Sequence, residues 1–337
     1  MNQEANRAET GNATEWKNVL LPAYEVRKRK AQKTAFIDML REHFGDRLRV
    51  ERCGSLVKSR NIVIGDPDTA DVIYTAHYDT CARLPFPNFI TPRNLPLYIL
   101  YQAAIALVFI IPLFALEALV FRLTRDLPEL PSLLITEGVL ILGIVGMFWV
   151  LMGDHPNPHT ANDNTSGVAV VLTLADRLAG ENAAFILFDN EENGLLGSMG
   201  YASAHPDIRK NRLIVNFDCV SDGANLLVLF SKKAEALPYY KVLCEGAERT
   251  FGGLSRTCEV CRKKGTIYPS DQANFQVSAA VCALNRSRHG ILYMDKIHTP
   301  KDTVFEDENL YALTELFSDP ALIGSFHEAE SAQTPGV

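Results

Sequence analysis

Two strongly apolar segments, residues 95–121 and 133–152, constrain the fold of this chain more than any other feature. The first contains no formally charged residue before Glu117, a run of 22 positions. At about 1.5 Å per residue, a helix of that length crosses a hydrocarbon core of about 30 Å. The second segment carries Glu137, but near the end that meets the connecting link, where a charge costs less than at the bilayer centre. We therefore predict a transmembrane helical hairpin at residues 95–152.

The same segments also fit a buried helical pair or a dimerisation arm in a soluble chain, and these alternatives stay open. Flanking charges do not settle the orientation of a hairpin, since Arg83 and Arg93 precede it while Arg122 and Arg125 lie in its link. Residues 1–16 are polar and lack the apolar core of a signal peptide. Seven cysteines, an odd number without framework spacing, fit reduced thiols better than disulfides. We expect the part of the chain outside the hairpin to lie in the cytoplasm.

The rest of the chain has the composition of a globular domain. Of 337 residues, 47% are hydrophobic and 22% are charged, which is enough to bury a large core. We expect one domain formed by residues 1–94 and 153–337, with the hairpin inserted into it. The net charge of −7 argues against a nucleic-acid partner held by phosphate contacts. A basic run at residues 27–30 can contact anionic lipid, although a solvated helix face explains such runs more often.

Helical and strand patterns alternate along this domain. Before the hairpin, the sequence predicts a long helix at 16–44 and short strands at 47–52, 61–64 and 72–76. After the hairpin, the predicted elements are helix 166–178, strand 184–188, helix 195–204, strands 213–217 and 226–230, helix 234–250, strand 279–284 and helix 308–328. This alternation predicts an α/β fold in which a mixed β-sheet is flanked by helices, in three layers.

His77 and Asp79 follow the predicted strand 72–76. Side chains two positions apart in an extended segment point to the same side. Asp79 can therefore accept a hydrogen bond from the His77 imidazole and direct its other nitrogen toward a metal ion. An isolated pair of this kind is more often a structural hydrogen bond.

Four further motifs place carboxylates and a histidine at strand ends or in loops. Asp163 lies in an Asn-Asp-Asn-Thr-Ser-Gly stretch that opens the helix after the hairpin, where the same residues also suit a helix cap. Glu191 and Glu192 follow one strand, Asp218 follows another, and His298 precedes the last helix. In α/β proteins, ligands bind beyond the carboxyl ends of the strands. Two histidines, three carboxylates and a spare glutamate suit two cations that share one carboxylate.

The order of these motifs resembles that of the di-zinc exopeptidase family that contains bacterial leucyl aminopeptidase, with glutaminyl cyclase as a related branch. The resemblance extends over residues 70–80 and 160–305. It implies a zinc exopeptidase-like fold and two zinc ions bridged by Asp163. The other four ligands would be divided between the two ions as His77 with Asp218, and Glu192 with His298.

The resemblance also implies the reaction, which is the hydrolysis of an N-terminal peptide bond. Glu191 would be the general base for a water molecule activated by the two zinc ions. Asp79 would orient His77. Tyr268 is a candidate oxyanion donor, although a packed strand aromatic explains it equally well. Gln272 departs from the pattern, since the family often has histidine at this position.

The hairpin is the larger departure from the family. This chain has 83 residues between Asp79 and Asp163, where most members of the family have a short connection. Because the insertion lies between two expected zinc ligands, its ends are expected to emerge close to the metal site. We also expect membrane lipid around residues 95–152.

Three functions stay open at this point. The leading hypothesis is a membrane-anchored zinc aminopeptidase acting on peptides or aminoacyl substrates with a free N-terminus. The second is a glutaminyl-cyclase-like aminoacyltransferase with one zinc, which the presence of both glutamates and the full ligand set disfavours. The third is a non-catalytic membrane scaffold on a peptidase fold, and the intact base and ligands argue against it.

Overall fold

Three strands in which every residue is buried form the centre of the sheet. They are β3 (Val72–His77), β4 (Ala183–Phe188) and β5 (Leu213–Phe217). β3 lies between the other two and pairs with both in parallel. Nearly continuous apolar runs of this kind are typical of parallel strands that are covered on both faces. The carboxyl ends of all three strands therefore meet at one edge of the sheet.

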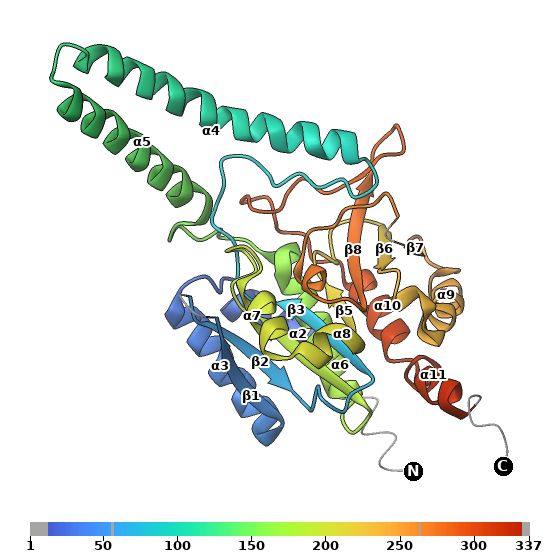
Figure 1. The fold of residues 1–337 in the computed structure, drawn as a ribbon. Coiled ribbons are helices and arrows are strands. Elements are labelled where there is room, and N and C mark those ends of the chain that lie inside the picture. Colours follow the sequence, from blue (N-terminus) through green and yellow to red (C-terminus); the bar gives the residue numbers. More distant parts are fainter. Residues whose placement is uncertain (1–12, 55–56, 263, 332–337) are drawn as a thin grey trace.

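The computed structural model describes residues 13–54, 57–262 and 264–331 (Figure 1). Within these residues, nine strands form one mixed sheet in the order β1-β2-β4-β3-β5-β8-β6-β7, with β9 paired to β8. The strands outside the centre are β1 (Leu48–Cys53), β2 (Ser59–Ile64), β6 (Asn225–Phe230), β7 (Thr257–Arg262), β8 (Ser278–Arg286) and β9 (Leu292–Tyr293). β2 pairs antiparallel with β1 and β4, whereas β8 pairs parallel with β5 and antiparallel with β6 and β9.

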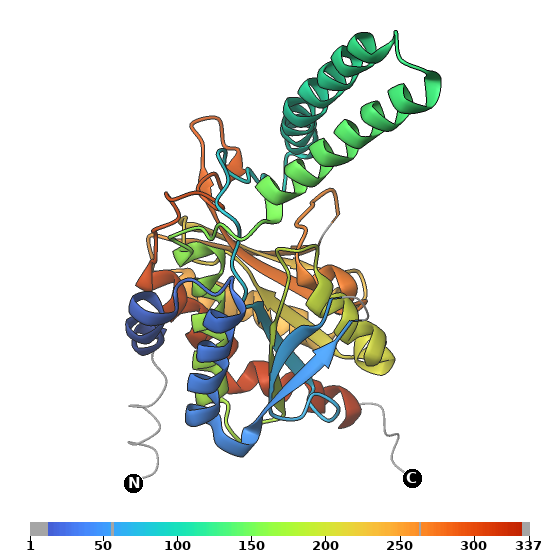
Figure 2. The ribbon, with the colours of Figure 1, turned by 90° about the vertical axis from the view of Figure 1, so that its left-hand side faces the viewer.

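Helices cover both faces of this sheet (Figures 1 and 2). Alternate residues of β3 enter different apolar clusters, with Tyr74 on one face and Ile73 on the other. The larger cluster takes in α2 (Ala13–Tyr24), α3 (Lys30–Phe44), α6 (Gly167–Arg177), α9 (Pro238–Phe251), α10 (Asp307–Phe317) and α11 (Pro320–Ser331). The smaller one takes in α7 (Leu196–Ala204) and α8 (Pro206–Asn211). The predicted three-layer α/β fold is confirmed.

The helix predicted over residues 16–44 is wrong as a single element. α2 ends at Tyr24 and α3 begins at Lys30. Between them Arg27 is fully buried, and its guanidinium Nε donates to the carbonyl of Tyr78 at 2.6 Å. Arg27 therefore does not belong to the expected basic surface, whereas Arg29 and Lys30 are exposed.

The C-terminal helix also consists of two pieces. α10 ends at Phe317, and Pro320 begins α11 at a position where its missing N–H costs no helical hydrogen bond. Residues 1–12 and 332–337, which belong to the expected globular domain and include most of the polar N-terminus, lie outside the described residues.

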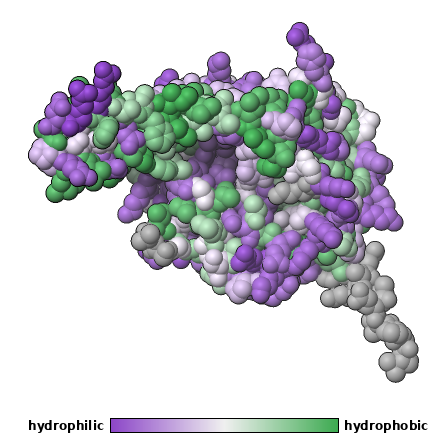
Figure 3. Space-filling view, turned by 45° about the horizontal axis from the view of Figure 1, so that its top comes forward, coloured by the Kyte–Doolittle hydropathy of each residue, from purple (hydrophilic) through white to green (hydrophobic). Residues whose placement is uncertain are grey.

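The two apolar segments form a pair of long helices that projects away from the sheet (Figures 1 and 2). They are α4 (Leu95–Thr124) and α5 (Glu129–Met152). Both are long and apolar enough to cross a membrane, with mean hydropathies of 2.6 and 2.2 in their most apolar windows. In the most apolar 18-residue stretch of each helix, none of the α4 residues and 6% of the α5 residues are buried in the protein. The alternative of a buried helical pair is therefore wrong for this chain. Apolar side chains accordingly dominate the hairpin surface in Figure 3.

The base of the hairpin is held close to the sheet edge that carries the candidate metal ligands. The two ends of the insertion pair with each other through a bridge between Ala82 and Pro156. On one side Asn157 N–H donates to the carbonyl of Cys81 at 3.2 Å. On the other side Leu84 N–H donates to the carbonyl of His298 at 2.8 Å. The expectation that the insertion begins and ends beside the candidate metal ligands therefore agrees with these contacts.

Candidate metal centre

The ends of the three central strands supply most of the candidate ligands. His77 is the last residue of β3, and in the parallel register it faces Phe188, the last residue of β4. Glu191 and Glu192 follow the end of β4 by three and four positions, and Asp218 follows β5 directly. Because these strand ends are adjacent, residues that are about 30 to 140 positions apart in sequence meet at one edge.

Asp163 reaches the same edge from an irregular turn, η2 (Ala161–Ser166), that precedes α6. The backbone of Asp163 is not helical, and the peptide bond to Asn164 is cis. Two backbone N–H groups of this turn, those of Asn162 and Asp163, donate to the buried carboxylate of Asp302 at 2.8 and 3.0 Å. Asp302 thus fixes the turn that presents Asp163.

Gly167, the first residue of α6, allows the turn to approach β5. A Cβ at this position would collide with the carbonyl oxygen of Phe217 and with the side chain of Asn164. The Asn164 amide in turn donates to that same carbonyl at 2.9 Å. The glycine that ends the Asn-Asp-Asn-Thr-Ser-Gly motif is therefore required by close packing.

The carboxylate of Asp163 lies between two histidines. Its Oδ1 is 3.3 Å from His77 Nε2, and its Oδ2 is 3.2 Å from His298 Nε2. Each oxygen thus belongs to a different histidine, which is the arrangement of a carboxylate that bridges two cations. The remaining predicted ligands complete two groups, since Asp218 Oδ1 is 3.5 Å from His77 Nε2 and Glu192 Oε2 is 3.3 Å from His298 Nε2.

Glu191 lies next to the first group. Its carboxylate shares a possible ligand cluster with His77 and Glu192. Removal from solvent, opposed by His77 and assisted by Glu192, raises the pKa of Glu191 well above its ordinary value. The structure therefore brings together all five predicted metal ligands and the predicted base.

Asp79 is placed differently from the prediction. His77 Nδ1 pairs with the backbone carbonyl of Asp79 at 3.1 Å, while the nearest carboxylate oxygen of Asp79 is 3.8 Å away. The carboxylate instead accepts the backbone N–H groups of Glu191 at 3.0 Å and Glu192 at 3.3 Å. Asp79 thus orients His77 through its main chain and holds the Glu191–Glu192 loop through its side chain.

The cluster gathers several buried carboxylates, whose negative charge a bound cation would balance. Burial opposes ionisation of Asp163, but hydrogen bonds to His298 and His77 outweigh it and lower the pKa of that carboxyl. Burial and the neighbouring Asp163 raise the pKa of Glu192 well above its usual value. Glu192 Oε1 is buried and has no hydrogen-bond partner. The residues fit cations of the zinc type, because the donors are imidazole nitrogens and carboxylate oxygens aimed at common points.

Two further carboxylates belong to this region and were not assigned a role from the sequence. Asp271, fully buried, has both carboxylate oxygens without a partner, and burial raises its pKa to about 7. Burial, with a contribution from Asp163, also raises the pKa of Asp302 to about 7. Asp271 is part of a Ser-Asp pair at 270–271, and Asp302 ends the stretch His-Thr-Pro-Lys-Asp at 298–302. The contacts of both carboxylates depend on the folded structure and not on these local sequences.

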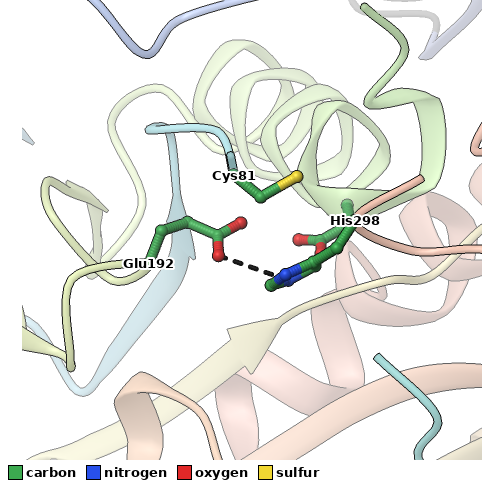
Figure 4. A group of neighbouring side chains, drawn as sticks. Cys81, Glu192 and His298 are labelled. Carbon is green, nitrogen blue, oxygen red and sulfur yellow. Dashed lines mark ion pairs between the residues drawn. The ribbon is translucent and has the colours of Figure 1, made fainter. Parts of the chain in front are cut away.

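Cys81 is a soft donor that lies among three of the candidate ligands, and the sequence analysis did not single it out. Its Sγ atom and one donor atom each of Asp163, Glu192 and His298 lie within 4.8 Å of one another. Figure 4 shows the Cys81 and Glu192 side chains directed toward His298 from separate loops. Burial, then Glu192 and Asp163, raise the pKa of the Cys81 thiol well above its ordinary value.

Tyr268 does not have the geometry expected of an oxyanion donor. It is buried, and its hydroxyl donates to the backbone carbonyl of Asp218 at 2.9 Å. Its single proton is therefore used within the protein. Gln272, the residue that departs from the family pattern, donates to the carbonyl of Tyr268 and accepts from Asn216. These contacts support the alternative in which Tyr268 is a packed aromatic that positions Asp218.

A cavity of about 590 Å³ lies between the base of the hairpin and the loop that carries His298. Trp149 and His155 line it from the hairpin side, and Leu84 from the segment that precedes the hairpin. Thr299 and Lys301 line it from the loop that follows His298. The cavity is large enough for a few amino-acid side chains, and Thr299 in its lining directly follows the candidate ligand His298 in the chain.

Comparison with known proteins gives one family and a common fold. The model of a family described as "Peptidase family M28" matches residues 148–317. The fold is similar to the LapA aminopeptidase of Legionella pneumophila, with a TM-score of 0.51, 13% identity, and coverage of 94% of this chain and 68% of that one. LapB of the same organism gives a TM-score of 0.50 and 16% identity, over 93% of this chain and 70% of that one. No curated protein matches significantly in sequence.

Proposed function

The chain belongs to peptidase family M28, and we propose that it is a membrane-anchored aminopeptidase that works with two zinc ions. The observation that carries this proposal is the position of Asp163. One oxygen of this carboxylate faces His77 and the other faces His298, at 3.3 and 3.2 Å. Each histidine has a second carboxylate beside it, so the residues form two donor groups that share a bridge.

The donor chemistry supports zinc in both groups. Four carboxylates and two imidazoles are packed at one sheet edge, and the unpartnered Oε1 of Glu192 is buried there. An unpaired buried carboxylate is costly, and a bound cation would supply the missing charge. When bound, zinc would activate a water molecule and polarise the carbonyl of the scissile bond.

The residues of the chain would then move the proton. Glu191 would accept a proton from the attacking water at its carboxylate and deliver it to the nitrogen of the leaving group. Such a positioned acid–base group contributes on the order of 10² to 10⁴ in rate. Asp79 would hold Glu191 in place, because it accepts the N–H of that residue at 3.0 Å. The cluster of carboxylates favours a substrate with a free amino terminus, and the cavity lined by Thr299, next to His298 in the chain, would take the side chains of a peptide.

The exposed hairpin supports the membrane anchor. α4 and α5 present large apolar side chains to their surroundings along most of their length, and lipid would remove this surface from water. The globular domain is formed by residues 1–94 and 153–337 in this proposal, and the hairpin by residues 95–152. A dimer contact along the hairpin is the alternative that the test must separate.

We also propose that the globular domain lies in the cytoplasm. Arg29 pairs with Asp154 at 2.8 Å, and Lys28 and Lys30 line a cavity together with Met152 at the end of α5. The fold thus adds positive charge from residues 28–30 to the base of the hairpin, which favours the cytoplasmic side for that end. All seven cysteines are free thiols, as expected in a reducing compartment.

The proposal is tested with full-length protein extracted in detergent. We expect about two zinc ions per chain, cleavage of aminoacyl amides, no cleavage of the same amides after N-acetylation, and loss of activity with a chelator that zinc reverses. One zinc per chain with formation of pyroglutamyl products would replace the peptidase by the cyclase-like alternative. Absence of zinc and of turnover would leave the scaffold alternative.

A further inference from the structure

Cys81 is held rigidly beside the donor group of His298. The residue follows β3 by four positions, and its side chain is almost completely buried. Its carbonyl accepts the N–H of Asn157, and the next residue, Ala82, pairs with Pro156. The main chain around the thiol is therefore fixed by the closure of the hairpin base.

The thiol lies at the same point as three candidate ligands. Its Sγ atom and one donor atom from each of Asp163, Glu192 and His298 fall within 4.8 Å of one another. These four side chains come from three strand-end loops and the turn before α6. A cysteine that merely packed against the core would not be expected to share this point with two carboxylates and an imidazole.

Glu192 gives an independent indication of a ligand at this point. The side chain is 5% exposed, its Oε2 pairs with His298 at 3.3 Å, and its Oε1 is buried without a hydrogen-bond partner. In Figure 4 one oxygen of Glu192 is directed at His298, while the other oxygen lies on the side of Cys81. A cation placed among these atoms would satisfy the unpaired oxygen and the thiol together.

We propose that the Cys81 thiolate is a fourth protein ligand of the zinc ion bound by Asp163, Glu192 and His298, an inference that rests on the proposed metal centre. On binding, the S–H bond breaks, a sulfur–zinc bond forms, and the proton leaves to solvent; no electrons are transferred. A tetrahedral zinc with four protein ligands is closed. The group of His77, Asp163 and Asp218 has three protein ligands and keeps an open position.

The two sites would then have different tasks. The open His77 site would take the water and the scissile carbonyl, and the closed Cys81 site would hold Asp163 and Glu192 in place. A thiolate also selects zinc over hard cations such as Mg²⁺ or Mn²⁺. We expect a chelator to remove the two ions in separate steps, the open site first.

Cobalt substitution tests the sulfur ligand without relying on activity. Full-length protein in detergent is stripped of metal and reloaded with Co²⁺, and we expect a sulfur-to-cobalt charge-transfer band in the near ultraviolet. Cys81→Ser should remove the band and weaken binding of one of the two ions at least about tenfold. Cys53→Ser, which changes a buried cysteine on β1, should leave the band unchanged.

Cys219→Ser tests the competing thiol, because Cys219 Sγ lies 3.1 Å from Asp218 Oδ1. Loss of the band in this variant, with the band retained in Cys81→Ser, would overturn the proposal. Zinc-edge X-ray absorption on the wild-type protein requires no variant to fold, and we expect one sulfur neighbour at about 2.3 Å for every two zinc ions. Two bound metals without sulfur would overturn the role of Cys81 alone, whereas no bound metal would overturn the proposed function as well.

Discussion

The carboxylate of Asp79 accepts the backbone N–H of Glu191 at 3.0 Å and so joins the end of β3 to the loop after β4. A second bond from the N–H of Glu192 uses the other oxygen at 3.3 Å. Asp79 is almost completely buried, so neither bond competes with bulk water. The main chain that presents the proposed base and a proposed ligand is therefore fixed by one carboxylate.

Asp79→Asn should lower kcat and leave the metal content unchanged. Asparagine retains one acceptor oxygen, so one of the two N–H groups loses its partner at a cost of about 1 to 3 kcal/mol. If that cost falls on the positioned base, kcat decreases by about 10 to 100-fold. Steady-state kinetics and zinc analysis measure the two effects. Asp207→Asn, at an exposed carboxylate of α8, is the control, and loss of zinc in Asp79→Asn would show that the residue acts mainly on the ligands.

Glu191→Gln should abolish turnover and leave both metal ions bound. Glutamine has nearly the same shape but cannot accept the proton from water, so the rate should decrease by about 10² to 10⁴. Aminoacyl-amide cleavage and zinc content are measured on the same preparation. Glu181→Gln, at an exposed position before β4, should behave as the wild type. Persistence of cleavage in Glu191→Gln would assign the base elsewhere.

Asp302→Asn should change the pH dependence of stability in the metal-free protein. Burial raises the pKa of Asp302 from 3.8 to about 7, so between about pH 4 and 7 the folded state keeps a proton that the unfolded state has lost. The protonated Asp302 therefore contributes its full share to the free energy of unfolding below about pH 4. This contribution decreases by about 4 kcal/mol in total as the pH rises to 7. Asparagine cannot ionise and lacks this slope.

The measurement for Asp302 is the melting temperature of chelator-treated protein across that range. The wild type minus variant difference should decrease steadily as the pH rises. Two curves that stay parallel from pH 4 to 8 would show that Asp302 ionises normally in the folded protein.

The hairpin should resist extraction by salt and release by alkali, and detergent should be required to solubilise the chain. High salt screens charge but does not weaken burial of apolar helices in lipid. A chain that high salt alone releases would be peripheral. Crosslinking in detergent distinguishes this result from an exposed dimer contact along α4 and α5.

Replacement of residues 95–152 by a short linker should give a soluble protein that still binds metal. The pair Ala82–Pro156 joins the two chain segments below the insertion, so the variant keeps this bridge and the linker closes the loop between residues 94 and 153. Substrate profiles of the two proteins then measure the contribution of the hairpin. Identical selectivity would limit the hairpin to anchoring, whereas a broader profile would assign it a part in substrate selection.

Sequence patterns predicted the three central strands and the hairpin well because those elements depend on local runs. The strand predicted at 213–217 coincides with β5, and α5 ends at Met152 as expected. The break between α2 and α3 was missed because it depends on Arg27, whose buried partners include Tyr78, 51 positions away. Helical periodicity carries no information about such a contact.

The residues proposed as metal ligands meet at one sheet edge, as their types and their places at strand ends predict, but their supporting residues were not predicted. Asp302 accepts two N–H groups from a turn about 140 positions earlier. Cys81 follows Asp79 by two positions, but Cys219 directly follows Asp218 in the same way, so nearness to a motif does not separate a ligand from a packed thiol. The place of Cys81 among Asp163, Glu192 and His298 results from the closure of the sheet edge.

The position of the insertion also fixes the order in which the site can be made. A chain leaves the ribosome from its N-terminus. His77 and Cys81 therefore emerge before the hairpin, whereas Asp163, Glu192, Asp218 and His298 all emerge after it. Helices α4 and α5 must partition between lipid and water before β3 has either of its neighbours. During biosynthesis, the complete set of six proposed donors is therefore available only after the hairpin has been synthesised. A chain that stalls while the hairpin inserts carries at most two of these donors, His77 and Cys81.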